Sequence, residues 1–348
     1  MEKTKIVMSD DPQPSYVELT PNAPDVGRVG YKDPSPAPPL KVLFCDHPRR
    51  PLAKIRYCSY YGEMFYALEE VFDITFTSKS PSKVSDLGDH WDAIILGFAH
   101  TDVGERKPRS IIQDTNIPLF PILNKEYAGL EGKLNWIKSM NATAALTVHH
   151  DFQKYSNVTG VPFHRIMWSA NEELFKDYKE DYKCDLFFCG VTRPEQTENI
   201  REKVLSNTSR LSDYKLIINN RAKKHRYAGK IFSPEEYARG LASSKICLIT
   251  TGPADLVGTR YFEVMAGNKS LILCNKMSEK IYGNMLIDGY NCIMFSSETD
   301  FFDKARFYLE NEEARVKIVN QAYNHFINSQ TWQHRAQQVL NIIKKYIS

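Results

Sequence analysis

The chain has 348 residues, of which 42% are hydrophobic and 25% are charged, so it is long enough for two domains that each bury a core. Its formal charge of +3 is too small to favour a nucleic acid as a partner. No apolar stretch approaches the roughly 20 residues that cross a bilayer, which argues against a transmembrane segment.

The cysteines favour a reducing environment. They are odd in number, form no C-x-x-C pair, and mostly lie inside apolar runs such as DLFFCG and KICLIT. Such residues are typical of reduced core cysteines, and the N-terminus has no apolar signal-peptide core. The sequence therefore predicts a cytoplasmic protein.

The first 39 residues differ from the rest of the chain. They are rich in Pro, Asp and Ser, lack hydrophobic periodicity and end in a proline cluster, so 1–39 is predicted to be a disordered or surface-draped arm. From residue 40 onward, strand-like runs alternate with helix-like segments, which predicts a parallel α/β sheet. The predicted strands are 41–45, 73–77, 92–98, 117–123, 144–148 and 163–168, and the predicted helices are 60–72 and 130–140.

A second series follows the charged, weakly apolar stretch 169–183, where we place a hinge. Ser233, Pro234 and Glu236 form a capping box with proline at the first helical position, which predicts a helix start. The predicted strands are 185–190, 214–220, 245–250, 269–274 and 291–295; the predicted helices begin near 194, at 233 and at 258, and three more cover 300–310, 311–328 and 332–347.

The expected architecture is α/β, with two doubly wound, Rossmann-like domains that each contain a parallel sheet and face a cleft. Ligands are expected at the carboxyl ends of the strands. The expected boundaries are 40–170 for the first domain, 171–330 for the second domain, and 331–348 for a C-terminal helix that packs near the domain junction.

The segment from Thr250 to Lys269 carries the strongest functional signal. It leaves a strand, crosses a Gly/Pro loop and enters a helix predicted to begin at Gly258. Unpaired amides and the positive end of the helix dipole would then face the cleft, where they bind a diphosphate. Gly258 allows close approach of the backbone, and Thr259 and Arg260 add hydrogen-bond donors.

Two carboxylates accompany this helix. Glu263 lies about one turn inside it, with apolar residues on the opposite face, so its carboxylate can accept both hydroxyls of a ribose. Asp255 lies in the preceding loop, where it can receive hydroxyls of a donor sugar.

The run RYFEVMAG (260–267), followed by an apolar strand, resembles the signature of group 1 glycosyltransferases of GT-B fold, and particularly of their CgeB-like (spore-maturation) branch. In those families a glutamate before a small-residue pair binds the nucleotide ribose, and an acidic residue eight positions earlier contacts the donor sugar. The resemblance thus implies these roles for Glu263 and Asp255, although the family more often has glutamate at the earlier position. It extends through most of the C-terminal half, from DLFFCGVTRPEQTENIREKVL to TWQHRAQQVLNII.

Catalysis in such an enzyme rests on positioning and electrostatics. Arg193, just after the turn at Gly190, is expected to reach the diphosphate and offset the charge of the leaving group, with Arg201 as the second choice. In a retaining member the leaving phosphate itself assists attack by the acceptor hydroxyl, so the protein needs no nucleophile.

Three loops after strands of the first series are expected to open toward the cleft. They would bind acceptor or sugar hydroxyls, and an inverting enzyme would draw its general base from among them. The candidates are His149 and Asp151 as catalytic groups, and Asp46, His47, Arg49, Lys125, Glu126 and His150 on the acceptor side.

Several motifs of other enzyme classes are missing from the sequence. It contains no G-x-G-x-x-G or G-x-x-x-x-G-K-S/T phosphate loop, no G-x-S-x-G elbow and no D-x-D motif after a strand. The adjacent His149 and His150 are not at the i, i+4 spacing that directs two helical ligands to one metal. A metal-independent enzyme that needs no cofactor is therefore expected.

The sequence thus predicts a glycosyltransferase that moves a hexose, deoxyhexose or pentose from a UDP- or GDP-sugar to a saccharide or glycoconjugate, with a retaining route preferred. A nucleotide-sugar epimerase of the same fold is an alternative within the enzymes. A catalytically silent sugar-binding or assembly protein is the alternative from another class.

Overall fold

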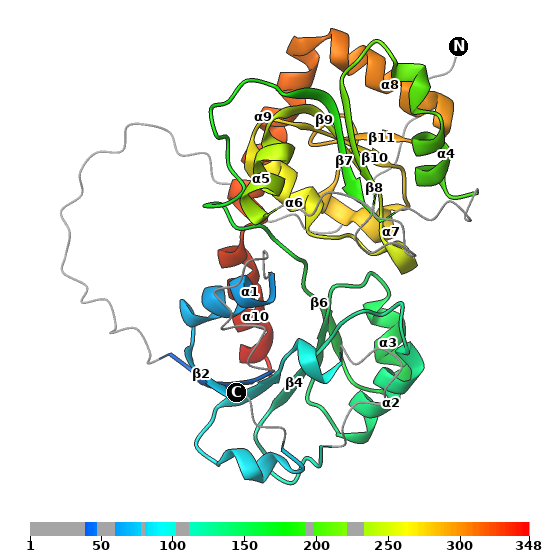
Figure 1. The fold of residues 1–348 in the computed structure, drawn as a ribbon. Helices are drawn as coiled ribbons and strands as arrows, with labels where there is room; N and C mark the ends of the chain where they lie inside the picture. Colours follow the sequence, from blue (N-terminus) through cyan, green and yellow to red (C-terminus); the bar gives the residue numbers. More distant parts are fainter. Residues whose placement is uncertain are drawn as a thin grey trace, which may run out of the picture. The chain divides into compact units, whose positions relative to one another are not determined.

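The computed structural model describes residues 39–46, 60–77, 81–101, 111–191, 198–220 and 233–347. The predicted arm lies outside these ranges except for its last residue, and so do His47, Arg49 and Arg193. Within the described residues the chain forms two separate parallel sheets with helices packed on them (Figure 1).

The first sheet has the order β2-β1-β3-β4-β5-β6, and every pairing in it is parallel. Strands β3 and β4 are buried throughout and β1 is buried except at Lys41, as expected of apolar strands in a sheet covered on both faces. The strands are β1 (Lys41–Cys45), β2 (Asp73–Thr77), β3 (Ala93–Leu96), β4 (Leu119–Leu123), β5 (Ala145–Thr147) and β6 (Phe163–Arg165); the helices are α1 (Tyr60–Glu69), α2 (Leu130–Ser139) and α3 (Phe152–Thr159).

The second sheet has the order β11-β10-β9-β7-β8 and is likewise parallel throughout. Its strands are β7 (Cys184–Gly190), β8 (Leu216–Asn220), β9 (Ser244–Ile249), β10 (Leu271–Asn275) and β11 (Ile293–Phe295). Its helices are α4 (Ile200–Ser206), α5 (Pro234–Ala242), α6 (Arg260–Gly267), α7 (Glu279–Tyr282), α8 (Glu298–Glu310) and α9 (Glu312–Ser329). Both sheets therefore reverse their strand order once, which confirms the doubly wound fold class.

Local capping explains where several helices begin. The predicted capping box of α5 is confirmed, since Ser233 Oγ accepts from Glu236 N at 3.1 Å and Glu236 Oε2 accepts from Ser233 N at 2.8 Å. Several elements differ from expectation; for example, β6 ends at Arg165 rather than at residue 168, and α7 was not predicted. Helix α3 was not predicted, because its sequence FQKYSNVT has few apolar positions, and α6 begins at Arg260 rather than at Gly258.

The last helix returns to the first sheet. α9 packs against α6 and β10, whereas α10 (Trp332–Lys344) lies beside α1 (Figure 1). Trp332, at the start of α10, is buried, and its Nε1 donates to Glu63 Oε2 at 3.1 Å. The C-terminal helix is thereby fixed to the helix that covers β1.

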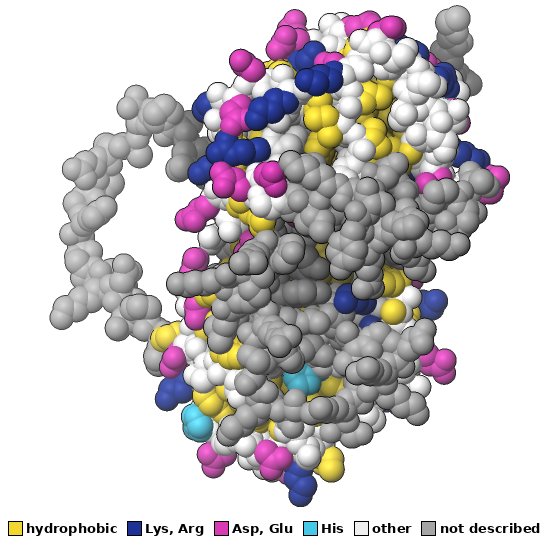
Figure 2. All heavy atoms as spheres, in the orientation of Figure 1, with side chains coloured by type: hydrophobic (Ala, Val, Ile, Leu, Met, Phe, Trp, Pro, Cys, Tyr) yellow, Lys and Arg dark blue, Asp and Glu magenta, His cyan; other side chains and the backbone are white. Residues whose placement is uncertain are grey.

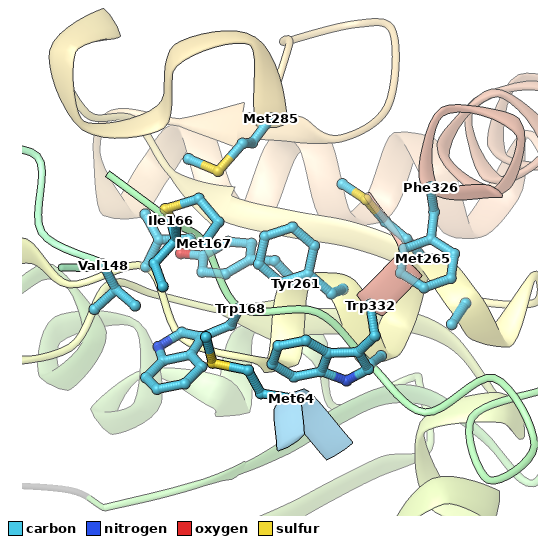
Figure 3. Packing of buried hydrophobic residues seen from close by; sticks show 14 of the residues in the cluster. Met64, Val148, Ile166, Met167, Trp168, Tyr261, Met265, Met285, Phe326 and Trp332 are labelled. Carbon is cyan, nitrogen blue, oxygen red and sulfur yellow. The ribbon is translucent and has the colours of Figure 1, made fainter. Parts of the chain in front are cut away.

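Three hydrophobic clusters form the core. One lies under α2 and α3, another lies between the second sheet and α8, and the largest contains residues of both sheets. Figure 3 shows part of the largest cluster, with Met64 of α1, Trp168, Tyr261 of α6 and Trp332 among its members. Burial on this scale is the main stabilising contribution to a fold.

Charged side chains of both signs occur on one face of the molecule. Figure 2 shows basic and acidic side chains interspersed on the face that it draws. Among the described residues, none of the helices is both long and apolar enough to cross a membrane.

Candidate functional site

The strand order of the second sheet reverses between β7 and β9, and Arg201 lies where the loops after these two strands diverge. Its Nη1 donates to Val191 O at 2.9 Å, after β7. On the other side, Nε donates to Thr250 Oγ1 at 2.5 Å and Nη2 donates to Thr251 O at 2.8 Å, after β9. A guanidinium thus marks the position at which doubly wound sheets bind ligands.

The loop after β9 is tightly folded. Gly252 N donates to Leu256 O at 2.8 Å, and Thr251 N donates to Asn275 Oδ1 at 3.0 Å. Ala254 and Asp255 both adopt left-handed backbone conformations, with φ of 56° and 55°. Such values are uncommon outside glycine and are characteristic of constrained functional loops.

A pocket of about 330 Å³ opens where this loop enters α6. Thr259 O accepts from Phe262 N at 2.9 Å and from Glu263 N at 3.0 Å, so the amides at the very start of the helix have no partner within it. Gly258, Thr259 and Arg260, predicted as donor-binding residues, all line this pocket, as does Lys125 from the first half of the chain. The other lining residues are Asn124, Tyr127, Val148, Trp168, Val191, Arg201, Ile249, Thr250, Gly252, Leu256, Val257 and Tyr261.

Glu263 is buried rather than directed into bulk solvent. It is 6% exposed, and Tyr237 Oη donates to its Oε2 at 2.8 Å. Burial raises the pKa of the carboxyl, while hydrogen bonds from Thr259 and Tyr237 and the charge of Arg260 oppose that rise. The described residues that line the 330 Å³ pocket do not include Glu263, which lies behind Arg260 on the same helix.

Gly190 leaves room for the side chain of Arg260. A Cβ at this position would lie 3.0 Å from Arg260 Nη1 and 2.9 Å from Phe188 Cζ, so the arginine or the ring would have to move. Arg260 also forms a hydrogen bond with Tyr237 and interacts electrostatically with Glu263. Gly190, Arg260 and Glu263 therefore belong to one connected group.

A second pocket, of about 340 Å³, lies at the loops after β4 and β5. It brings together five predicted residues, from three separate segments of the chain: Glu126, His149, His150, Asp151 and Asp255. Leu130, Leu134, Lys154, Tyr155, Val158 and Ala254 complete the lining. Asp255 is thus placed with the acceptor-side candidates rather than in the pocket lined by Gly258.

Both ring nitrogens of His149 are engaged. Asp151 N donates to Nδ1 at 3.1 Å, and Tyr155 Oη lies 2.9 Å from the same atom. Because Nδ1 accepts, the proton of the neutral ring is on Nε2, which donates to Ala254 O at 3.0 Å. Burial lowers the pKa of His149, which keeps the ring neutral.

We expect this histidine to make folding sensitive to mild acid. With a folded-state pKa below the unfolded value of about 6.5, the unfolded chain binds more protons between the two values, so the free energy of unfolding falls as the pH drops through that window. Urea unfolding at about pH 7.5 and pH 5.5 should show a smaller pH-dependent loss for His149→Asn than for the wild type. The same loss in both proteins would assign the acid sensitivity to other histidines, such as His150 and His164, whose pKa values burial also lowers.

Asp151 forms an ion pair with Lys280, 129 residues further along the chain. Its Oδ1 lies 3.8 Å from His150 Nε2. The ligand atoms of His149, His150 and Asp151 lie within 4.8 Å of one another, which is close enough for one metal ion. A metal would have to displace Ala254 O or the donors to Nδ1 from His149, and Lys280 from Asp151.

Asp46 forms a hydrogen bond inside the first half of the structure. It is buried, and its Oδ2 accepts from Phe98 N at 3.0 Å, which joins the ends of β1 and β3. The described lining of the two pockets does not include it. A Cβ at Gly97 would overlap this carboxylate, so glycine is required there.

The sequence did not indicate several residues of the site. Tyr237 and Lys280 are unremarkable in a helical sequence, and Trp168 lies in an apolar run that predicts a strand. Their roles come from partners distant in the chain, so no local pattern marks them. Arg201 was only the second choice, after Arg193, and it is the one that the structure describes.

Comparison with known proteins agrees with this geometry. Residues 195–341 match a family model described as glycosyl transferase-like. This segment includes Arg201, Asp255, Gly258 and Glu263. No similar relative was found among curated protein sequences.

Solved structures show the fold. A sucrose-phosphate synthase from Thermosynechococcus elongatus has a TM-score of 0.57 at 10% identity, over 88% of this chain and 98% of that one. Anabaena Alr3699/HepE in complex with UDP and glucose has a TM-score of 0.54 at 10% identity, over 88% and 100%. A glycosyltransferase from Rickettsia africae has a TM-score of 0.52 at 9% identity, over 89% and 99%. The two parallel sheets thus form the GT-B fold.

Proposed function

From the GT-B fold and the match of residues 195–341 to the glycosyl transferase-like family, we propose that the chain is a glycosyltransferase that uses a nucleotide-diphosphate sugar. The observation that carries the proposal is the 330 Å³ pocket at the start of α6. Thr259 and Arg260 at the start of α6 line it together with Arg201, and helix-start amides and guanidinium groups are the donors that bind a diphosphate.

UDP is the proposed donor nucleotide. Alr3699/HepE has been crystallised with UDP-glucose as well as with UDP, which supports a uridine nucleotide for the same fold. Glu263 is proposed to bind the ribose, directly or through Arg260. Asp255 is proposed to bind the donor sugar. Arg193, outside the described residues, is proposed to act on the diphosphate with Arg201.

A retaining, metal-independent route is part of the proposal. The two groups that the sequence suggested as catalytic bases are both engaged, His149 by its neighbours and Asp151 by Lys280. The leaving phosphate would then accept the proton of the attacking hydroxyl, and the protein would contribute positioning and charge. We propose that residues 40–170 form the acceptor side and residues 171–330 the donor side. We also propose a cytoplasmic location and membership of the CgeB-like branch.

Gly258→Ala tests the donor pocket with little effect on folding. A Cβ at Gly258 meets no heavy atom within 4 Å, and its φ lies outside the left-handed region, so the variant should fold normally. The added methyl group projects into space that the donor would occupy, which costs about 1 to 3 kcal/mol. Calorimetric titration of UDP and UDP-glucose should show affinity reduced about tenfold or more.

Gly132→Ala is the matched control, because Gly132 is exposed on α2 and an added Cβ there also meets no heavy atom within 4 Å. It should leave nucleotide affinity unchanged. Equal binding by wild type and Gly258→Ala would remove the donor site from this pocket. Incubation with UDP-glucose and no acceptor adds a further check, because formation of a different nucleotide sugar would identify an epimerase instead.

A further inference from the structure

The 340 Å³ pocket beside Asp255 contains a buried carboxyl group whose hydrogen bonding is incomplete. Glu126 follows β4, is 3% exposed and lines this pocket. Its Oε1 accepts from Thr147 Oγ1. Its Oε2 is shielded from solvent and has no hydrogen-bond partner among the described residues.

Thr147 determines which oxygen of the Glu126 carboxyl is available to a ligand. Its hydroxyl oxygen accepts from His149 N at 3.1 Å and donates to Glu126 Oε1. The Thr147 contact therefore occupies Oε1 and leaves Oε2 for another group. An unsatisfied buried oxygen destabilises the folded state, and a ligand hydroxyl at this position would supply the missing hydrogen bond.

The burial of Glu126 does not prevent a ligand from reaching it. The side chain forms part of the pocket wall, and the terminal torsion of a glutamate is soft, so the carboxyl turns at low cost to present Oε2. Burial raises the pKa of the Glu126 carboxyl, while the hydrogen bond from Thr147 and the charge of Lys133 oppose that rise.

The walls of the pocket differ in character. Leu130 and Leu134 of α2 and Val158 of α3 form an apolar side, and Glu126, His150 and Asp255 are polar. A sugar ring has the same division, with apolar C–H faces and a polar edge of hydroxyls. The pocket therefore suits one pyranose unit.

The charges in the lining argue against an anionic ligand. Three carboxyl groups face the pocket, from Glu126, Asp151 and Asp255, against one lysine, Lys154. Lys280 is already paired with Asp151, and burial lowers the pKa values of His149 and His150. With Asp151 paired to Lys280, Glu126 and Asp255 remain against Lys154, so the lining offers no excess of positive charge to a phosphate or a uronate.

We propose that this pocket binds the acceptor as an uncharged sugar unit, and that Glu126 binds one of its hydroxyls. The inference rests on the proposed transferase function. One loop connects the two pockets, because Gly252, Leu256 and Gly258 line the 330 Å³ pocket whereas Ala254 and Asp255 line this one. Asp255, proposed to bind the donor sugar, also lines this pocket, so the acceptor unit would lie next to the donor sugar, where the two can react.

Glu126→Ala tests the assignment by separating acceptor binding from donor binding. The protein is saturated with UDP, and methyl α-glucoside, methyl α-mannoside and methyl β-galactoside are titrated by saturation-transfer NMR. We expect at least one of them to bind the wild type, and its affinity to fall about tenfold in the variant, since a lost hydrogen bond to a buried carboxyl costs about 1.4 kcal/mol. The affinity for UDP should not change. Glu131→Ala, an exposed glutamate on α2, is the matched control.

Each other outcome overturns the inference. No glycoside bound by the wild type, equal binding by wild type and Glu126→Ala, or tighter binding of glucose 6-phosphate than of the glycosides would each exclude an uncharged acceptor at Glu126. Weaker binding of UDP-glucose by the variant, with glycoside affinity unchanged, would assign the pocket to the donor sugar. Failure of UDP to bind the wild type would instead contradict the proposed function, so the two failures are distinguishable.

Discussion

Replacing Glu263 with alanine is expected to lower the affinity for UDP and UDP-glucose about a hundredfold, because hydrogen bonds to a charged group contribute about 1.5 to 3 kcal/mol. Two effects combine in this variant. The carboxylate that we propose binds the ribose is removed, and Arg260 loses the negative charge with which it interacts. Calorimetric titration at constant salt measures the change.

The result must be separated from a loss of folding. Tyr237 Oη donates to Glu263, and its removal leaves a buried hydroxyl without that partner, at a cost of about 1 to 3 kcal/mol in the free energy of unfolding. Glu263→Gln keeps an acceptor for Tyr237 and loses the charge, so it should be nearly as stable as the wild type and still bind UDP more weakly. Glu313→Ala, at an exposed position of α9, should alter neither property. Unchanged UDP affinity in Glu263→Ala would remove the nucleotide assignment of this residue.

Trp332→Ala is expected to reduce the free energy of unfolding by about 3 to 5 kcal/mol, the usual cost of truncating a large buried aromatic. The indole is 5% exposed, belongs to the cluster that contains residues of both sheets, and donates to Glu63 of α1 (Figure 3). Its loss leaves a cavity where α10 packs on α1. Urea unfolding followed by circular dichroism measures the difference.

Two further variants make that prediction specific. Trp332→Phe fills most of the cavity but cannot donate to Glu63, so it should lose only part of the stability. Its neighbour Gln333 is exposed, and Gln333→Ala should have little effect. A loss below about 1 kcal/mol for Trp332→Ala, the range of surface substitutions, would show that the α10 contact contributes little to folding.

Much of the fold follows from short-range patterns in the sequence. Continuous apolar runs such as KVLFC and KICLIT can be buried on both faces only as central parallel strands, and they form β1 and most of β9. The capping box at Ser233 marks the start of α5 because its donors and acceptors lie within four consecutive residues. Helix α3 was missed because its sequence is mostly polar and has no clear local pattern. Its contacts with α2 and β6 stabilise it as a helix.

The structure places the predicted site residues in different environments, through contacts that no local sequence pattern encodes. Asp255 and Glu263 lie eight positions apart on one loop and helix, yet the loop directs Asp255 to the pocket of His149 while Glu263 lies behind Arg260. Asp46 resembles a residue at a cleft but joins the ends of two strands through Phe98 N.

The sequence alone therefore indicated two parallel sheets, most of their strands and helices, and the loop-to-helix segment that follows β9, because periodicity, caps and apolar runs act over a few residues. Only the tertiary structure decided that His149 binds Ala254 O across 105 residues, that Lys280 pairs with Asp151, and that Glu126 Oε2 has no hydrogen-bond partner within the described ranges. These pairings depend on which distant backbone segments the folded core brings within about 3 Å of each other, the range of a hydrogen bond.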